Sequence, residues 1–404
     1  MKRTRVVVTG IGLVSPVGCG VESFVHSIKQ GKTGIAQAKR IDTRSPGKLC
    51  AEVIDYEPDK LFEVNKIRRM GRFSLMALGA TKLALFDAGI DRTQYRDEDI
   101  GIVLSTHYGP SDTVSAYMEK VIRYQEMSPV LFSQTVMNVP IGYISMEFQI
   151  KGPSTFLQGG DGFLFGYEHI RSGDSSFLLL GGVDELTQNI FDSYDALNLI
   201  TDIDNTTQKE KVIHYLPENG FFLGEGACVL VLEEYEKAYT SGRNIYGEII
   251  GVGYSSDTIN EQTIIKKSDQ GKGMKLAIER AIESAQIEKK EIRSIFSCDN
   301  GSAEVKYAEQ NALKQIFCEG LEEKMIITGK RYYGEGFHAA NYFNISLALL
   351  CLKDNELYLS LQRQNDPAGR TTGKEEADYI LCNNIYNNGT NSSIILKRIH
   401  ADEG

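Results

Sequence analysis

Short apolar runs rich in β-branched residues alternate with helical patterns along the whole chain, and this alternation limits the possible folds more than any other feature. Several of the runs are apolar at consecutive positions, as strands buried on both faces require. The alternation favours an α/β architecture in which sheets lie between layers of helices. The predicted strands are Arg5–Thr9, Gly101–Ser105, Phe177–Leu180, Val229–Leu232, Ile249–Val252, Ile295–Ser297, Met325–Thr328, Tyr379–Cys382 and Ser393–Leu396.

Helical periodicity is clearest in two segments that occupy similar places in the two halves of the chain. Leu75, Leu78, Leu85 and Phe86 mark one face of the first segment, and apolar residues from Met274 to Ala285 follow the same spacing in the second. Beyond about position 247, strands and helices alternate again as though the first half were repeated. Since no low-complexity linker intervenes, we expect two closely packed halves, 1–248 and 249–404, each with its own sheet.

Charge and cysteine content exclude several classes of function. The chain has 404 residues and a formal net charge of −10 with both signs interspersed, which argues against nucleic acid and anionic membranes as partners. Seven cysteines without CxxC pairs or zinc-site spacing predict no metal site and no disulfide framework, and they favour a reducing, cytoplasmic environment. No apolar run reaches the roughly 18 residues of a membrane span, and nothing in the sequence indicates a cofactor.

Four glycine-containing segments, in a fixed order, carry a resemblance that covers residues 3 to 398. They are Val7–Gly12 followed by Ser15–Gly18, Arg69–Phe73, Gly220–Ala227 and Gly389–Asn391. Together they resemble the β-ketoacyl synthase family of the thiolase superfamily. The resemblance implies a duplicated α-β-α-β-α layered sandwich that dimerises. It also implies a site with a cysteine at a helix N-terminus, where free N–H groups and the helix dipole activate the thiol, together with two histidines and a lysine.

The cysteine of that site has no counterpart in this chain. Counting from Gly152, the family position falls on Asp161, or near Gln158 if the turn is shortened, and the stretch to Asp174 is about five residues shorter than the family usually shows. Neither residue is a thiol. Glutamine followed by two glycines resembles the chain-length factors, the non-condensing partners of type II polyketide ketosynthases. The alternative is that Gln158 is an ordinary polar residue at a strand end.

Both histidine positions also differ from the family pattern. Asn300 or, counted without a gap, Cys298 stands at the first, and Glu335 stands at the second, five residues after a retained Lys330. His338 follows three residues later and could approach the site. Without the family, Glu335 is best interpreted as an ion-pair partner of Lys330 or Arg331, and Cys298 as a small buried apolar residue.

The resemblance therefore implies a catalytically inactive chain-length factor. Such a subunit pairs with an active ketosynthase and limits the growth of a polyketide chain carried by an acyl carrier protein. The segment after Tyr108 would line the tunnel at the interface of the two subunits, and the lining residues would be Pro110, Thr113, Tyr117, Phe132 and Ser133. The same residues would equally suit the core of a dimer interface.

Two other functions remain compatible with the sequence. One is an active β-ketoacyl synthase or malonyl-thioester decarboxylase with relocated groups, in which Cys298 supplies the thiol and His338 the base. The other is a homodimeric acyl-binding module that acts without a partner.

Overall fold

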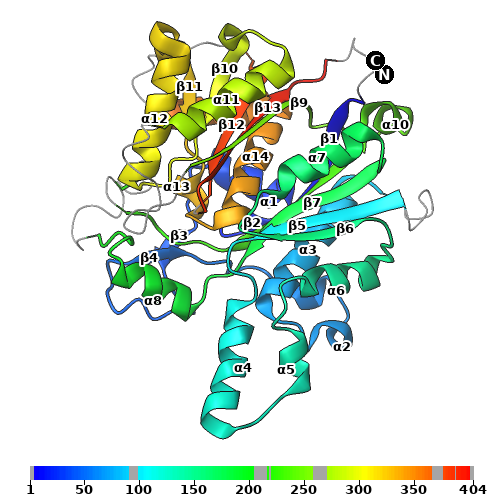
Figure 1. The fold of residues 1–404 in the computed structure, drawn as a ribbon, viewed down its shortest axis with the longest axis vertical. Coiled ribbons are helices and arrows are strands. Elements are labelled where there is room, and N and C mark those ends of the chain that lie inside the picture. The colour runs from blue at the N-terminus through cyan, green and yellow to red at the C-terminus, as the bar shows by residue number, and fades with distance from the viewer. Residues whose placement is uncertain are drawn as a thin grey trace.

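The computed structural model describes residues 4–90, 99–203, 216–217, 220–257, 271–365, 376–386 and 388–400. Five strands of the first half lie side by side in the order β6 (Ser154–Gln158), β5 (Ile100–Thr106), β7 (Phe177–Asp184), β8 (Gly226–Glu234) and β1 (Val6–Ser15) (Figure 1). β5 is parallel to β6 and β7, whereas β8 is antiparallel to both of its neighbours. We call these five strands the first array.

The second half repeats this arrangement. Its strands follow the order β11 (Met325–Ile327), β10 (Ile292–Phe296), β12 (Tyr379–Ile385), β13 (Thr390–Lys397) and β9 (Gly247–Ser256), with the same sequence of parallel and antiparallel pairs. We call them the second array. Every predicted strand is present, and the predicted duplication of the architecture is confirmed.

The expectation of a separate sheet for each half is wrong in one detail. Val6, Val7 and Val8 pair with Ile249, Glu248 and Gly247, so β1 and β9 join the two arrays. Together with β2 (Gly18–Cys19), the arrays form one 11-stranded sheet. Because β1 pairs with β8 along its other edge, the N-terminal strand lies in the middle of the sheet order.

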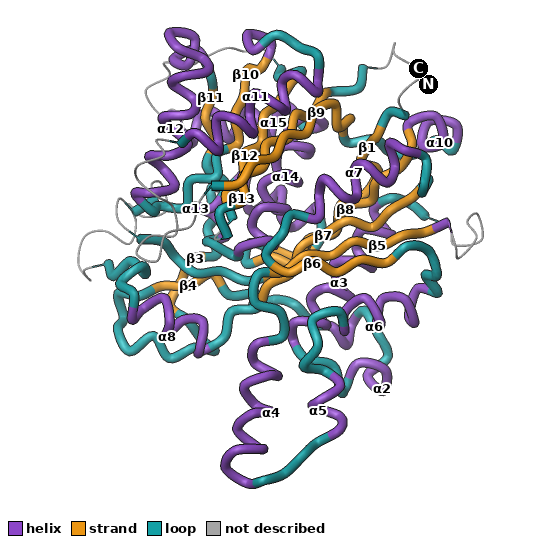
Figure 2. The backbone as a smooth tube through the Cα atoms, viewed as in Figure 1, coloured by secondary structure: helices purple, strands orange, loops and turns teal. Residues whose placement is uncertain are grey.

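Helices cover both faces of each array, which gives the predicted α-β-α-β-α layers (Figure 2). α3 (Arg72–Asp87) and α6 (Val139–Phe148) pack outside the first array, and α11 (Lys272–Ala285) and α12 (Ala303–Phe317) outside the second. α7 (Gly162–Ser172) and α14 (Phe337–Lys353) form the central layer, and sixteen of the seventeen residues of α14 are buried. Consecutive residues of β7 face opposite layers of helices, because Leu178 packs with the central layer and Leu179 with α3.

The Val-Thr-Gly-Ile-Gly motif lets a helix lie directly on a strand. A Cβ atom added to Gly12 would stand 1.8 Å from the carbonyl oxygen of Ala80 in α3. The second half uses the same device, since a Cβ on Gly253 would stand 2.0 Å from the carbonyl oxygen of Ala277 in α11. Larger residues would push the helices off the sheet at both places.

Two short helices project from the body beyond the first array (Figure 1). They are α4 (Ser111–Tyr124) and α5 (Pro129–Ser133), and neither contains a buried residue. The remaining helices and strands are α1 (Val21–Lys29), β3 (Ile35–Gln37), β4 (Leu49–Ala51), α2 (Val64–Ile67), α8 (Gln188–Ala196), α10 (Tyr235–Thr240), α13 (Lys330–Tyr333) and α15 (Asn355–Asn365).

Candidate active site

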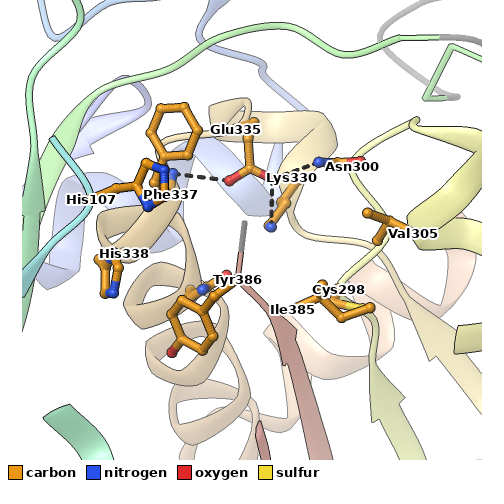
Figure 3. A pocket seen from close by; sticks show the side chains of 11 residues that line it. His107, Cys298, Asn300, Val305, Lys330, Glu335, Phe337, His338, Ile385 and Tyr386 are labelled. Carbon is orange, nitrogen blue, oxygen red and sulfur yellow. Dashed lines mark hydrogen bonds and ion pairs between the residues drawn. The ribbon is translucent and has the colours of Figure 1, made fainter. Parts of the chain in front are cut away.

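A small polar cavity lies where the start of α14 meets the loop before α12 and the end of β12 (Figure 3). Its volume is about 20 Å³, room for about one water molecule. It brings together five of the residues that the sequence singled out, Cys298, Asn300, Lys330, Glu335 and His338. The cavity is lined by these five together with His107, Val305, Phe337, Asn341, Ile385 and Tyr386.

Glu335 is the centre of a buried hydrogen-bond network that fills one side of the cavity. Its Oε2 accepts hydrogen bonds from Lys330 Nζ at 2.7 Å and from Asn300 Nδ2 at 2.8 Å, and its Oε1 accepts from the backbone N–H of Phe337 at 2.9 Å (Figure 3). The Lys330 and Glu335 side chains are only 3% and 8% exposed. The ion pair that the sequence favoured for Glu335 is therefore present, and Asn300 completes it.

The backbone around Glu335 is held by the glycine-rich segment at 220–227. The N–H of Glu335 donates to the carbonyl oxygen of Phe222 at 2.7 Å, and the N–H of Gly224 donates to the carbonyl oxygen of Glu335 at 2.9 Å. Gly334 has a φ of 69°, a conformation that favours glycine, and it lets the chain turn between α13 and α14. These bonds fix the carboxylate in the cavity whatever its partners do.

Cys298 lines the cavity but is poorly suited to act as a nucleophile. Its side chain is 1% exposed, and burial, with a further contribution from the Glu309 carboxylate, raises the pKa of the thiol well above its usual value. A thiolate is the reactive form of cysteine. Cys298 therefore behaves as the small buried residue at a strand end that the sequence also allowed.

His338 is buried and neutral. Its Nε2 lies 3.0 Å from the carbonyl oxygen of Gly160, which can only accept, so the proton is assigned to Nε2. Burial, and then the neighbouring His107, lower the pKa of His338 to about 3. Its Nδ1 lies 3.8 Å from Oδ2 of the buried Asp184. The imidazole thus stays uncharged near pH 7 and is turned toward α7 and β7 rather than toward Cys298 (Figure 3).

Asp161, and not Gln158, stands at the N-terminus of α7. Its Oδ1 accepts a hydrogen bond from the N–H of Phe163 at 2.8 Å, and its Oδ2 accepts from the hydroxyl of Tyr254 at 2.9 Å. Burial raises the pKa of this carboxyl group. A helix N-terminus that would otherwise offer N–H groups to a thioester oxygen is capped by an acidic side chain of the chain itself.

Gln158 is the last residue of β6, where it pairs with Thr106 of β5 and is exposed. It does not line the cavity. Asp161 thus stands at the helix start and Gln158 at the strand end.

Arg72 and Glu225 form a second buried charge cluster, which explains two of the glycine-containing segments. Glu225 is fully buried and accepts hydrogen bonds from the guanidinium groups of Arg72 and Arg40 and from the N–H groups of Val53 and Leu186. Burial alone would raise the pKa of Glu225, but the hydrogen bonds from Arg72 lower it. The cluster joins α3 to the turns on either side of the first array.

The five residues expected to line a tunnel lie on or beside the projecting helices α4 and α5. Pro110 is buried at the start of α4, and Thr113 and Tyr117 are half-buried on one side of that helix. The Tyr117 and Phe132 rings lie 5.6 Å apart across the hairpin. Ser133 is exposed, and its hydroxyl donates to the carbonyl oxygen of Val130 in its own helix. Four of the five thus follow the hairpin, and Pro110 lies at its base.

His107 lines the cavity, although the sequence analysis did not single it out. It follows β5 directly, and its ring stacks on Phe337 with centroids 5.1 Å apart. Burial lowers the pKa of His107, so it too is neutral near pH 7. The sequence could have indicated His107 by its position directly after a buried strand, because ligand-binding sites of α/β proteins form at the ends of such strands.

The described parts of the chain contain no group of three or more His, Cys, Asp or Glu residues that could hold a metal ion. Among the helices described, none is long and apolar enough to cross a membrane.

Comparisons with known proteins agree with this architecture. The family described as "Beta-ketoacyl synthase, N-terminal domain" matches residues 3–238, and "Beta-ketoacyl synthase, C-terminal domain" matches residues 246–362. The chain therefore belongs to the β-ketoacyl synthase family. The 3-oxoacyl-[acyl-carrier-protein] synthase 2 of Vibrio harveyi is 27% identical over 99% of this chain and 100% of its own length.

Two solved structures share the fold over nearly the whole chain. "The ishigamide ketosynthase/chain length factor" superposes with a TM-score of 0.81 and 23% identity, covering 98% of this chain and 100% of that one. A type II polyketide synthase ketosynthase in complex with its acyl-carrier protein, "AntDE:AntF", superposes with a TM-score of 0.78 and 19% identity, with coverages of 98% and 100%. The chain is thus ketosynthase-like throughout.

Proposed function

We propose that this chain is a catalytically inactive chain-length factor of a type II polyketide synthase. The observation that carries the proposal is the Asn300–Glu335–Lys330 network. Asn300 and Glu335, which the resemblance places at the two histidine positions of the family with Cys298 as the alternative for the first, are hydrogen-bonded to each other. The cavity beside them has room for about one water. A carboxylate also has the wrong charge for stabilising an enolate or a thioester oxyanion.

The start of α7 supports the same conclusion independently. Asp161 occupies the helix N-terminus and accepts a hydrogen bond from the N–H group of Phe163 there, so that N–H group is not free for a thioester oxygen. Condensation would need a thiol at this point. The nearest cysteine in the cavity, Cys298, has its pKa raised by burial.

An active ketosynthase is the proposed partner, and the surface around α4 supports it. Eight of the nineteen large apolar side chains exposed in the described residues lie between Val114 and Val136, in and next to α4 and α5. Exposed apolar side chains gathered on one surface are typical of an interaction site. Val114, Met118 and Ile122 form a stripe on one side of α4, four residues apart. Among the described strands, β6 is the last in the sheet order, and edge strands can pair with another chain.

The role in measuring chain length rests on the hairpin. We propose that Thr113, Tyr117, Phe132 and Ser133, with Pro110 at the base, line a tunnel that the ketosynthase completes, and that Tyr117 limits its depth. The growing chain would arrive on an acyl carrier protein, as the comparison structure of a ketosynthase with its carrier protein suggests by its title.

Purified proteins test both parts of the proposal. The chain alone should consume no malonyl-carrier protein, whereas the chain together with its ketosynthase should form polyketide. Tyr117→Ala should lengthen the product by opening the tunnel, while Tyr239→Ala, which alters an exposed tyrosine on α10, should leave the product unchanged. Condensation or decarboxylation by the chain alone would instead establish the relocated-site enzyme. Unchanged product length in Tyr117→Ala would remove the measuring role.

A further inference from the structure

The turn after β7 anchors the projecting helix α4 to the body. Asp112 in the first turn of α4 donates its N–H to Oε1 of Glu185 at 3.0 Å. The Ser111 and Thr187 hydroxyls lie 3.2 Å apart, and the side chain of Asn189 donates to the hydroxyl of Ser115 at 2.6 Å. Since α4 buries none of its own residues, these polar contacts at its base bear directly on where it points.

Glu185 also reaches a second helix. Its Oε2 accepts a hydrogen bond from the N–H of Phe73 in the first turn of α3, at 3.2 Å. One carboxylate, 4% exposed, thus joins the N-termini of the rigid helix α3 and the projecting helix α4. Thr113 packs at the same place, since a Cβ on Gly71 at the start of α3 would stand 2.9 Å from its hydroxyl oxygen.

We propose that Glu185 is a positioning residue that sets the direction of α4, and through it the room beside Thr113 and Tyr117 that limits product length. This inference rests on the proposed function of the hairpin. Glu185 itself touches no part of the tunnel lining named above except through the backbone of α4. Glu185 acts by holding the N-termini of α3 and α4 at a fixed distance from each other.

The ionisation of Glu185 makes the tether sensitive to pH near neutrality. Burial, with a smaller contribution from the Asp112 and Glu225 carboxylates, raises the pKa of Glu185 to about 7, although the hydrogen bonds from the two backbone N–H groups act in the opposite direction. Arg72 faces the same cluster from α3. The charged carboxylate holds both N–H groups more strongly than the protonated one, so the first turn of α4 should loosen as pH falls through about 7.

Hydrogen exchange of the full-length chain, followed by mass spectrometry, tests the tether. Glu185→Gln should speed exchange in residues 111–116 by about tenfold at pH 8, because a charge-assisted hydrogen bond is lost. Glu119→Gln, which removes an exposed charge from the same helix, should not. After correction for intrinsic exchange rates, lowering the pH to 6 should speed exchange in the unaltered chain and not in Glu185→Gln. Should that variant not fold, Glu185→Asp, too short to reach both amides, replaces it.

The outcomes separate this inference from the function on which it rests. Faster exchange together with a mixed product length in the presence of the ketosynthase supports the tether. Unchanged exchange overturns it, and so does a pH effect that persists in Glu185→Gln, because the effect would then belong to Asp184, whose pKa burial also raises to about 7. If Tyr117→Ala alters product length and Glu185→Gln does not, the tether fails and the measuring role stands. If neither alters it, the measuring role fails.

Discussion

The network at Glu335 predicts an unusual order of stabilities among three variants. Lys330→Met leaves a buried carboxylate without its cation, and Glu335→Met leaves a buried ammonium group without its anion. Removing one partner of a buried ion pair costs about 3–5 kcal/mol. Replacing both partners by apolar side chains leaves no charge behind, and such replacements are often close to neutral. The double variant should therefore be more stable than either single variant.

The expected shifts are large enough to measure by thermal unfolding. At about 2.1 cal/mol/K per residue, 404 residues give an unfolding entropy of roughly 0.85 kcal/mol/K. Each single variant should then lower Tm by about 4–6 °C, and the double variant by less than half of that. Lys60→Met, which breaks an exposed pair with Glu57, is the control and should leave Tm unchanged. Additive losses in the double variant would refute the buried, coupled network.

Three further outcomes follow from the described contacts. Iodoacetamide at pH 8 should alkylate the exposed Cys318 and spare Cys298, because burial raises the pKa of the Cys298 thiol, as peptide mass spectrometry would show. Arg72→Ala should lower the free energy of unfolding by about 3 kcal/mol, because Glu225 stays buried with one cation fewer. Burial raises the pKa of Asp184 to about 7, so its contribution to stability should decline as pH rises from about 4 to 7 in urea titrations.

Each of these outcomes has a control. Faster labelling of Cys298 than of Cys318 would restore the relocated-thiol enzyme. Arg68→Ala, at an exposed position near Arg72, should cost little. The stability lost in Arg72→Ala should shrink below about pH 4, because the lowered pKa of Glu225 contributes stability only while that group is ionised. Asp184→Asn should reduce the pH dependence between 4 and 7 and leave the part that Glu185 contributes, since burial raises the pKa of Glu185 to about 7 as well. An unchanged pH dependence in Asp184→Asn would assign the titration to other groups.

Local patterns in the sequence were sufficient to predict most of the fold. Buried strands such as Phe177–Leu180 have to be apolar on both faces, and Gly12 and Gly253 have to lack a side chain where helices lie on them. The ion pair of Lys330 with Glu335 could also be predicted from the sequence, since the two residues are only five positions apart. Each of these features depends on residues that are close in the sequence, or on the periodicity of one helix or strand.

Contacts between segments that lie far apart in the sequence could not be predicted in this way. Asn300 meets Glu335 across 35 residues, and His107 reaches the cavity from the other half of the chain. The choice between Gln158 and Asp161 needed the start of α7, because a loop shortened by about five residues makes counting ambiguous. The proposed lining residues of the hairpin stay a prediction, since the surface that would cover them belongs to a partner.

The place of β1 in the middle of the sheet affects how the chain reaches its fold during synthesis. β1 leaves the ribosome first, yet its neighbours β8 and β9 begin only at Gly226 and Gly247. At about 5–20 residues per second, a strand that is mostly apolar waits roughly 10–40 s before it can pair with β8 or β9. The first half produced alone would leave the β9-facing edge of β1 without that partner, and the second half produced alone would lack β1 beside β9. Production of the intact protein should therefore depend on chaperones that shield the first strand.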